Sequence, residues 1–242
     1  MPIATIDARE LVGGLLTCGD ANVFPANALE GPGGAELRAD EAAAGLRAAL
    51  ADTERVQFPH SGWHLVAQST TRVQFIARGA GADSWFSVSL VRGPAGWTLD
   101  LAGECGLVVV LGPGIGPAAW WLDPAQPRPG AKDRTFTALV LERACASGHS
   151  SDGRIGPPLV SYAPDTVTLI FGVRPRPGGQ DCQGNPPGRY RVTLDQPLGD
   201  RQLLDGGSLP PRDATVAPDP PLGAPAGQPA DGLERARLVE RR

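Results

Sequence analysis

Four consecutive side chains carry the chemical groups of a hydrolase: His149, Ser150, Ser151 and Asp152, in a segment flanked by glycines. A hydroxyl, an imidazole and a carboxylate are the groups that make up a catalytic triad. The members of a triad must converge in space from different segments, which neighbours in sequence do not do. The chain also lacks a G-x-S-x-G nucleophile turn. We interpret the segment as a turn and assign it no catalytic residue.

The spacing of the histidines, cysteines and glycines also gives little support for a metal site or a phosphate-binding loop. His60 and His64 have i, i+4 spacing, but Pro59 and Gly62 oppose the helix that would bring their rings together. No two cysteines form the close pair typical of a zinc site. The glycine-rich stretch 112–116 has neither the Lys-Ser/Thr of a phosphate loop nor G-x-G-x-x-G spacing. The sequence therefore predicts no metal site and no cofactor.

The four cysteines lie far apart: Cys18, Cys105, Cys145 and Cys182. An even count at long spacing is typical of disulfides in an oxidising compartment. Cys18 follows a predicted helix and Cys105 follows the last predicted strand of the same unit, so we expect them to pair, and Cys145 with Cys182. In the chain-entropy treatment the second bridge stabilises its module by about 4 kcal/mol. We predict two structural disulfides and an extracytoplasmic location, secreted or in the cell envelope.

The charge of the chain argues against a nucleic-acid partner. Its net charge is −4 and its pI is near 5.4, whereas phosphate binding needs a basic excess. Arginines nevertheless recur beside inward-pointing residues of the C-terminal half. They could line one outward face that takes an acidic protein or polymer: Arg143, Arg174, Arg176, Arg189 and Arg191. The alternative is an ordinary solvated sheet surface.

Tryptophans recur at the predicted strands: Trp63, Trp85, Trp97, Trp120 and Trp121. Aromatic residues at strand positions usually belong to a core. The alternative is an exposed aromatic platform for a glycan or a partner protein. No paired carboxylates at informative positions support a glycosidase.

The N-terminal part of the chain supplies helical patterns. Leu11, Leu15 and Cys18 have helical spacing, which predicts a helix over 6–18. Small apolar residues with the same period predict a second helix over 38–53.

An alternating pattern begins at residue 62 and predicts a meander of four short strands: 63–68, 72–77, 85–91 and 97–101. The turn-forming residues 93–96 join the last two strands as a hairpin. Residues 1–124 are thus expected to be an α+β domain, with two helices laid on one antiparallel sheet.

The C-terminal part has further strand patterns, at 135–144, 165–174 and 190–194. They predict a small β-sandwich-like module over 134–211, stapled by the Cys145–Cys182 bridge. The polar segment 125–133 is either a domain boundary or a long inter-strand loop. Residues 212–242 are rich in proline and alanine and are predicted to be a disordered tail. The whole chain is therefore expected to be a β-rich α+β protein.

The N-terminus is not a typical signal peptide, since Asp7, Arg9 and Glu10 interrupt it and no long apolar core follows. The longest uncharged run, 106–122, contains two prolines and is shorter than a membrane span. Two explanations remain open. Either the chain is a mature form or an excised ectodomain, or its cysteines are reduced and the compartment is a different one.

Several blocks of the sequence match a pattern found in other proteins. The most specific blocks are Glu142-Arg143-Ala144-Cys145 and the run CQGNPP from Cys182 to Pro187. Others are GWHLVAQSTTRVQFIA and the PLGDRQLLDGG that ends at Gly207. On these blocks the chain resembles, over about residues 5–211, an uncharacterised family of secreted or membrane-anchored actinobacterial proteins. The resemblance implies an extracytoplasmic module with disulfides, and it implies no activity.

Three functions follow as hypotheses. The first is a non-enzymatic extracytoplasmic module that binds a protein or an envelope polymer through a sheet face or the arginine surface. The second is a hydrolase that uses His149 or His64, for which a histidine should lie within hydrogen-bond reach of a carboxylate in a deep pocket. The third is the sensor ectodomain of an anchored regulator.

Overall fold

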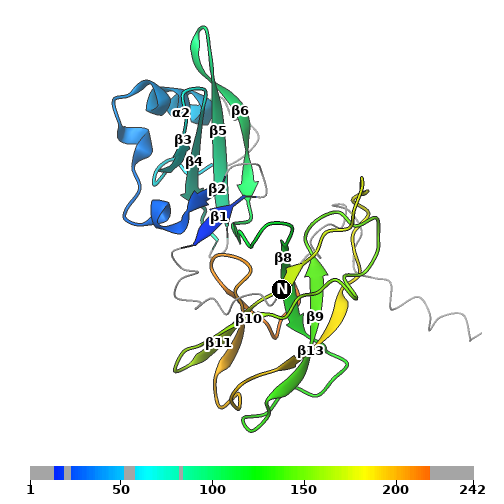
Figure 1. Cartoon of the computed structure of the whole chain (residues 1–242). Helices are drawn as coiled ribbons and strands as arrows, with labels where there is room; N and C mark the ends of the chain where they lie inside the picture. The colour runs from blue at the N-terminus through cyan, green and yellow to red at the C-terminus, as the bar shows by residue number, and fades with distance from the viewer. Residues whose placement is uncertain (1–13, 19–22, 52–57, 82–83, 219–242) are drawn as a thin grey trace, which may run out of the picture.

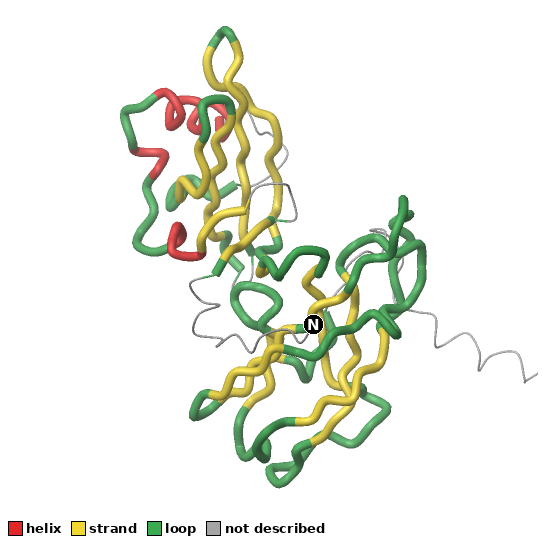
Figure 2. The backbone as a smooth tube through the Cα atoms, in the orientation of Figure 1, coloured by secondary structure: helices red, strands yellow, loops and turns green. Residues whose placement is uncertain are grey.

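A computed structural model describes residues 14–18, 23–51, 58–81 and 84–218. They form two lobes, the upper one blue to green and the lower one green to orange in Figure 1. Figure 2 shows that the helices lie on one side of the upper lobe, whereas the lower lobe consists of strands and loops.

The upper lobe is built on an antiparallel meander of four strands. Each strand arises from the alternating pattern noted in the sequence, and each pairs with its neighbour along the chain. Gly93 and Gly96 face each other at the turn between the last two strands, so the predicted hairpin is confirmed. The strands are β3 (His64–Gln68), β4 (Arg72–Arg78), β5 (Trp85–Gly93) and β6 (Gly96–Cys105).

Helix α2 (Glu41–Ala51) packs against one face of this sheet. Asp40 caps its N-terminus, because one carboxylate oxygen accepts a hydrogen bond from the Ala43 N–H at 2.9 Å. At Gly45 an added Cβ would lie 2.8 Å from the Cβ of Trp97 and 2.9 Å from Leu90, so only glycine permits this close approach of helix and sheet. Fully buried side chains such as Leu46 fill the space between them.

The predicted first helix is wrong where the structure describes it. Its last residues form strand β1 (Leu15–Thr17), in which Leu16 is buried and Leu15 exposed. In so short a segment the leucine spacing is compatible with a helix or with a strand, and pairing with other segments of the chain decides between them. The predicted residues 6–13 lie outside the described part of the chain. The partner strands of β1 are β2 (Val23–Pro25) and β7 (Val108–Val109).

The fold is therefore β-rich, and the expected pair of N-terminal helices on a sheet is not found. In the described residues α2 is the one α-helix, accompanied by two short 3-10 helices, η1 (Ala26–Leu29) and η2 (Ala35–Leu37). None of the helices described is long and apolar enough to cross a membrane.

The lower lobe is a sandwich of two four-stranded sheets that share one core. Trp120 is fully buried in this core, stacked on Phe136 and edge-on to Phe171. The first sheet runs β12 (Gly172–Val173), β8 (Gly116–Leu122), β9 (Thr135–Glu142) and β13 (Gly188–Thr193). The second runs β10 (Leu159–Tyr162), β11 (Thr166–Ile170), β14 (Gln202–Asp205) and β15 (Arg212–Asp213).

Hydrogen bonds from one edge of β8 join the two sheets. Each N–H on this edge needs an acceptor because it is buried. The acceptors for Ala118, Trp120 and Leu122 are the Phe171 carbonyl at 3.0 Å, the Asp205 carboxylate at 3.3 Å and the Ala214 carbonyl at 2.8 Å. The carboxylate of Asp205 thus occupies a position in the hydrogen-bond pattern that a neighbouring strand would normally fill.

Segment 125–133 connects two strands of the same sheet and does not separate two sheets. Strands β8 and β9 on either side of it are antiparallel neighbours, with Trp120 opposite Val140. Of the two alternatives for this segment, the structure shows the inter-strand loop.

Ordered structure also continues past the expected start of the tail at residue 212. Strand β15 pairs with β14, and Ala214 is fully buried in the core of the sandwich. The pairing with β14 overrides the proline-rich composition at this point. The rest of the predicted tail, residues 219–242, lies outside the described part of the chain.

The two lobes meet at a joint made by residues 206–211, between β14 and β15. The Leu209 carbonyl accepts a hydrogen bond from the indole N–H of Trp85 at 3.0 Å, and the Leu209 N–H donates to Leu107 at 3.0 Å. Ile170 and Leu209 of the lower lobe pack in one apolar cluster with Trp85 and Leu107 of the upper lobe. The lobes therefore share a core at this joint.

Candidate functional site

A disulfide joins two long loops of the sandwich, and these loops form the candidate site. Cys145 and Cys182 are bonded with Cα atoms 4.6 Å apart, which confirms the predicted bridge. The bridge connects residues 144–154, which follow β9, with residues 174–187, which precede β13. We refer to these two segments as the stapled loops. Cys18 and Cys105 form the second predicted bridge, in the upper lobe.

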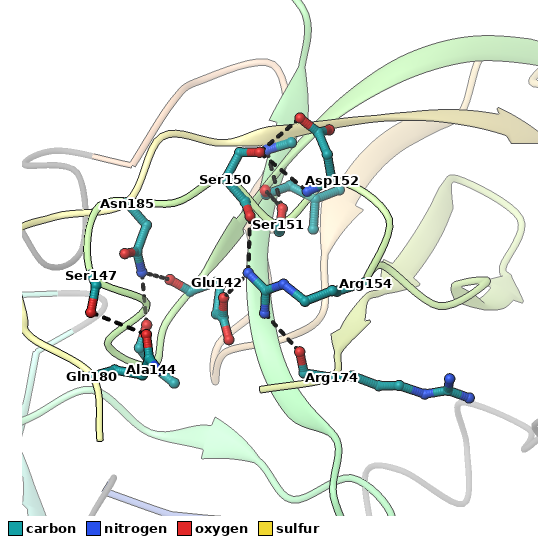
Figure 3. A network of polar contacts seen from close by, with 12 residues as sticks. Glu142, Ala144, Ser147, Ser150, Ser151, Asp152, Arg154, Arg174, Gln180 and Asn185 are labelled. Carbon is teal, nitrogen blue, oxygen red and sulfur yellow. Dashed lines mark hydrogen bonds and ion pairs between the residues drawn. The ribbon is translucent and has the colours of Figure 1, made fainter. Parts of the chain in front are cut away.

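Ser147 fixes the two stapled loops to each other beside the disulfide. Its N–H donates to the Asp181 carbonyl at 2.9 Å, and its hydroxyl oxygen accepts from the Asp181 N–H at 3.0 Å. The hydroxyl also contacts the side chain of Gln180 at 3.1 Å, as Figure 3 shows. The Ser147 backbone has a positive φ of 51°, which is uncommon outside glycine. The reciprocal contacts hold this turn in its unusual conformation.

Asn185 closes the second loop onto the first. Its amide N–H₂ group donates to the carbonyl of Ala144 at 2.7 Å and to that of Glu142 at 3.3 Å. Both bonds join the Asn185 side chain to the backbone of the first loop and the end of β9. They therefore fix the position of the second loop just before β13. The two loops are thus joined at two places, by Ser147 beside the disulfide and by Asn185 near β13.

A buried ion pair lies beneath the stapled loops. Arg154 donates to Glu142 Oε2 at 2.6 Å, and the side chains of Glu142 and Arg154 are 3% and 18% exposed. The same guanidinium donates to the carbonyls of Ser150 at 2.9 Å and Arg174 at 2.7 Å. One planar cation therefore binds the end of β9 and both loops (Figure 3).

The serines of the predicted turn have structural roles. Ser151 is fully buried; its hydroxyl donates to the Val140 carbonyl at 2.7 Å and accepts from the Gly188 N–H at 3.1 Å. Ser150 donates to Asp152 at 2.8 Å. This bond, followed by one from the Arg189 N–H, lowers the pKa of the Asp152 carboxyl. These side chains anchor the loop to β9 and β13 rather than forming a nucleophile and its base.

The histidines do not assemble a site in the described residues. His60 and His149 are exposed, and His64 is partly buried on β3. None of the hydrogen bonds found among described residues joins a histidine ring to a carboxylate. The described chain also holds no group of three or more His, Cys, Asp or Glu residues placed to bind a metal ion. The geometry required for the hydrolase hypothesis is therefore not met there.

The five predicted surface arginines do not share one face. Arg174 is exposed at β12, and Arg189 and Arg191 are exposed on β13, at the opposite edge of the same sheet. Arg189 donates to Asp123 at 3.1 Å. Arg176 is partly buried in the second stapled loop, and Arg143 turns inward. Arg174 extends away from the polar network in Figure 3, which leaves its charge available to a partner.

A second group of charges is buried at the base of the joint. The Asp205 carboxylate accepts hydrogen bonds from Arg212 at 3.0 Å, the Gly207 N–H at 3.0 Å and the Trp120 N–H. Burial raises the pKa of Asp205, opposed first by the Gly207 bond and then by Arg212. Burial lowers the pKa of Arg143, which feels the charges of both Asp205 and Arg212.

Sequence analysis missed the polar residues that organise the site: Glu142, Arg154, Asn185, Asp205 and Arg212. One signal was present for Glu142, which continues the inward alternation of Phe136, Ala138 and Val140. A carboxylate at an inward position requires a buried partner. Nothing in the spacing identified Arg154 as that partner.

All five tryptophans are at least partly buried, and Trp63 and Trp120 are completely so. The core interpretation therefore holds for these two and for Trp85, which is 9% exposed and packs in the apolar cluster at the joint.

Comparison with known proteins finds no matching family model, no matching curated protein and no matching solved structure. The case for a function rests on the stapled loops themselves.

Proposed function

We propose that the protein is a non-enzymatic binding module of an extracytoplasmic compartment, which recognises a protein or polymer of a bacterial cell envelope through the stapled loops. The observation that carries this proposal is the cross-linking of two exposed loops at one edge of a sandwich. The Cys145–Cys182 bridge, Ser147, Asn185 and Arg154 all connect the loops.

Rigid loops favour binding because little conformational entropy is lost when a partner docks. Loop residues such as Arg174, Gln183 and Asp181 are exposed. The polar residues that fix the loops, Ser147, Arg154 and Asn185, are partly buried. Exposed polar groups on a fixed backbone offer hydrogen bonds and charge in a constant arrangement. This separation of anchoring and exposed residues suits recognition.

The extracytoplasmic location is supported by the two disulfides, which persist in oxidising compartments and are rare in reducing ones. The resemblance to secreted or membrane-anchored actinobacterial proteins agrees with this location.

Co-sedimentation with purified bacterial cell walls tests the proposal. We expect the protein to sediment with walls that retain their anionic polymers, and Arg174→Gln to reduce the bound fraction several-fold. Arg191→Gln is the matched control, since it removes the same charge from an exposed position on β13 outside the stapled loops. Equal binding by both variants and the native protein, or no sedimentation at all, would contradict recognition of walls through the loops.

A further inference from the structure

We propose that Arg143 and Arg212 form a binding site for a small oxyanion, such as a carboxylate or phosphate group, at the base of the joint between the lobes. This site is separate from the stapled loops and does not depend on the function proposed for them.

The first observation is that Arg143 is a mostly buried cation without a partner. Its Nε is buried and has no hydrogen-bond acceptor. Within the described part of the chain, none of its other donors takes part in a hydrogen bond or an ion pair. A buried guanidinium N–H without a hydrogen-bond acceptor is costly, so such a group is normally found with an anion in contact.

The second observation is the charge balance around Asp205. Its carboxylate is already bound to Arg212 at 3.0 Å and to two backbone N–H groups. Arg143 directly follows Glu142, which pairs with Ala118 in the sheet. The Ala118 carbonyl lies against Gly207, whose N–H donates to Asp205, so Arg143 starts close to this carboxylate. The charges of Asp205 and Arg212 act on the pKa of Arg143 in opposite directions, and burial lowers it. Two cations therefore share one carboxylate, and the group carries one uncompensated positive charge. An added anion would neutralise it.

The third observation is that further donors at the same place have no acceptor. The Nε of Arg212 and the hydroxyl of Ser208 are both buried without a hydrogen-bond partner. Ser208 lies within the joint, opposite Val108, and Arg212 follows the joint and pairs with Asp205. An oxyanion has several lone pairs and can accept from donors on different segments at once.

The charged groups around Arg143 and Arg212 limit what the site can hold. Asp205 faces Arg212 directly, and Glu142, next to Arg143 in sequence, has one oxygen paired with Arg154 and the other without a partner. A metal cation would meet the unpaired guanidinium, so an anion is the better match. The side chain of Arg212 is 22% exposed, which gives a small ion a route to the site from solvent.

Thermal unfolding of the full chain in different salts tests the site. Sodium phosphate, sulfate and acetate are compared with sodium chloride at equal ionic strength and pH. We expect one or more oxyanions to raise the melting temperature saturably, by about 3–6 °C at ten times the dissociation constant. A preference for phosphate or sulfate identifies a phosphoryl-type ligand, and a preference for acetate a carboxylate.

The variant Arg143→Met should abolish this response, because it removes the uncompensated charge and keeps an apolar side chain of similar length. It is expected to fold, since Arg143 makes no hydrogen bond or ion pair among the described residues that the substitution would break. Arg143→Lys is a second variant, which retains the charge but not the planar donors and should weaken the response. Arg191→Gln is the control and should respond like the native protein. Equal effects of oxyanions and chloride, or a full response in Arg143→Met, would refute the site.

Discussion

Individual charged residues stabilise this protein in two different ways. Arg154 and Glu142 form a pair in which one cation serves several acceptors. Asp205 instead sits where burial opposes its charge, although it accepts three hydrogen bonds. Substitution of the two carboxylates should therefore affect stability differently.

Asp205→Asn should alter how stability depends on pH. Because the pKa of Asp205 is raised on folding, the folded protein holds this proton more tightly than the unfolded chain. The contribution of Asp205 is most favourable below the unfolded pKa of about 3.9 and is lost as the pH rises through the folded value. Urea unfolding between pH 3.5 and 8 should show the native protein losing stability relative to the variant over this window. Parallel profiles would show that Asp205 ionises normally.

At the scale of the element, helix α2 depends on one cap. The bond between Asp40 and the Ala43 N–H lowers the pKa of the Asp40 carboxyl, with Arg38 contributing next. Asp40→Ala should lower the free energy of unfolding by about 1 kcal/mol, as measured by urea unfolding at pH 7.

The charge of Asp40 adds a pH-dependent part to this effect. With a lowered pKa, its contribution is present above the unfolded value and lost as the pH falls through the folded one. Asp40→Asn retains a capping side chain without the charge and should be milder than Asp40→Ala. If both variants match the native protein, the cap contributes nothing.

The two disulfides should differ in how readily they are reduced. Cys182 is exposed, whereas Cys105 is 5% exposed. Thiolate attack requires access to a sulfur atom, so limited dithiothreitol under native conditions should open the Cys145–Cys182 bridge first. Alkylation followed by peptide mass spectrometry identifies the free thiols. Simultaneous loss of both bridges would indicate that reduction proceeds through global unfolding.

The strands of the upper lobe could be predicted because their alternation is local. The predicted 72–77, for example, corresponds to Arg72–Arg78. Elements defined by long-range pairing could not. Leu15–Thr17 is a strand because it pairs with Val23–Pro25 and with the distant Val108–Val109. Arg212–Asp213 is a strand because it pairs with β14. The same limit applied to the site, where the cysteine pairing was predicted but the Glu142–Arg154 pair was not.

At the scale of the whole molecule, the joint determines how the lobes are held. Gly207 lies in it, with its position set by hydrogen bonds to Asp205 and Val109. An added Cβ would come within 2.6 Å of the Ala118 carbonyl oxygen, which is backbone and cannot turn aside. The joint therefore has no room for a larger residue at this point.

Gly207→Ala should destabilise the protein by about 2–3 kcal/mol, because backbone must shift to accept the methyl group. The matched control is Gly179→Ala, since no heavy atom lies within 4 Å of a Cβ at that position. Urea unfolding followed by tryptophan fluorescence measures both variants, and Trp85 reports on the joint directly. Equal stability of the two variants would show that the joint adapts without cost.

The joint also constrains the order in which the molecule can be completed. The indole of Trp85 finds its acceptor at Leu209, 124 residues further along the chain. During synthesis from the N-terminus, the upper lobe can form its meander early, but its cluster around Trp85 stays open until the last strands of the lower lobe emerge. A chain interrupted before Leu209 would thus expose apolar surface in the lobe that was made first.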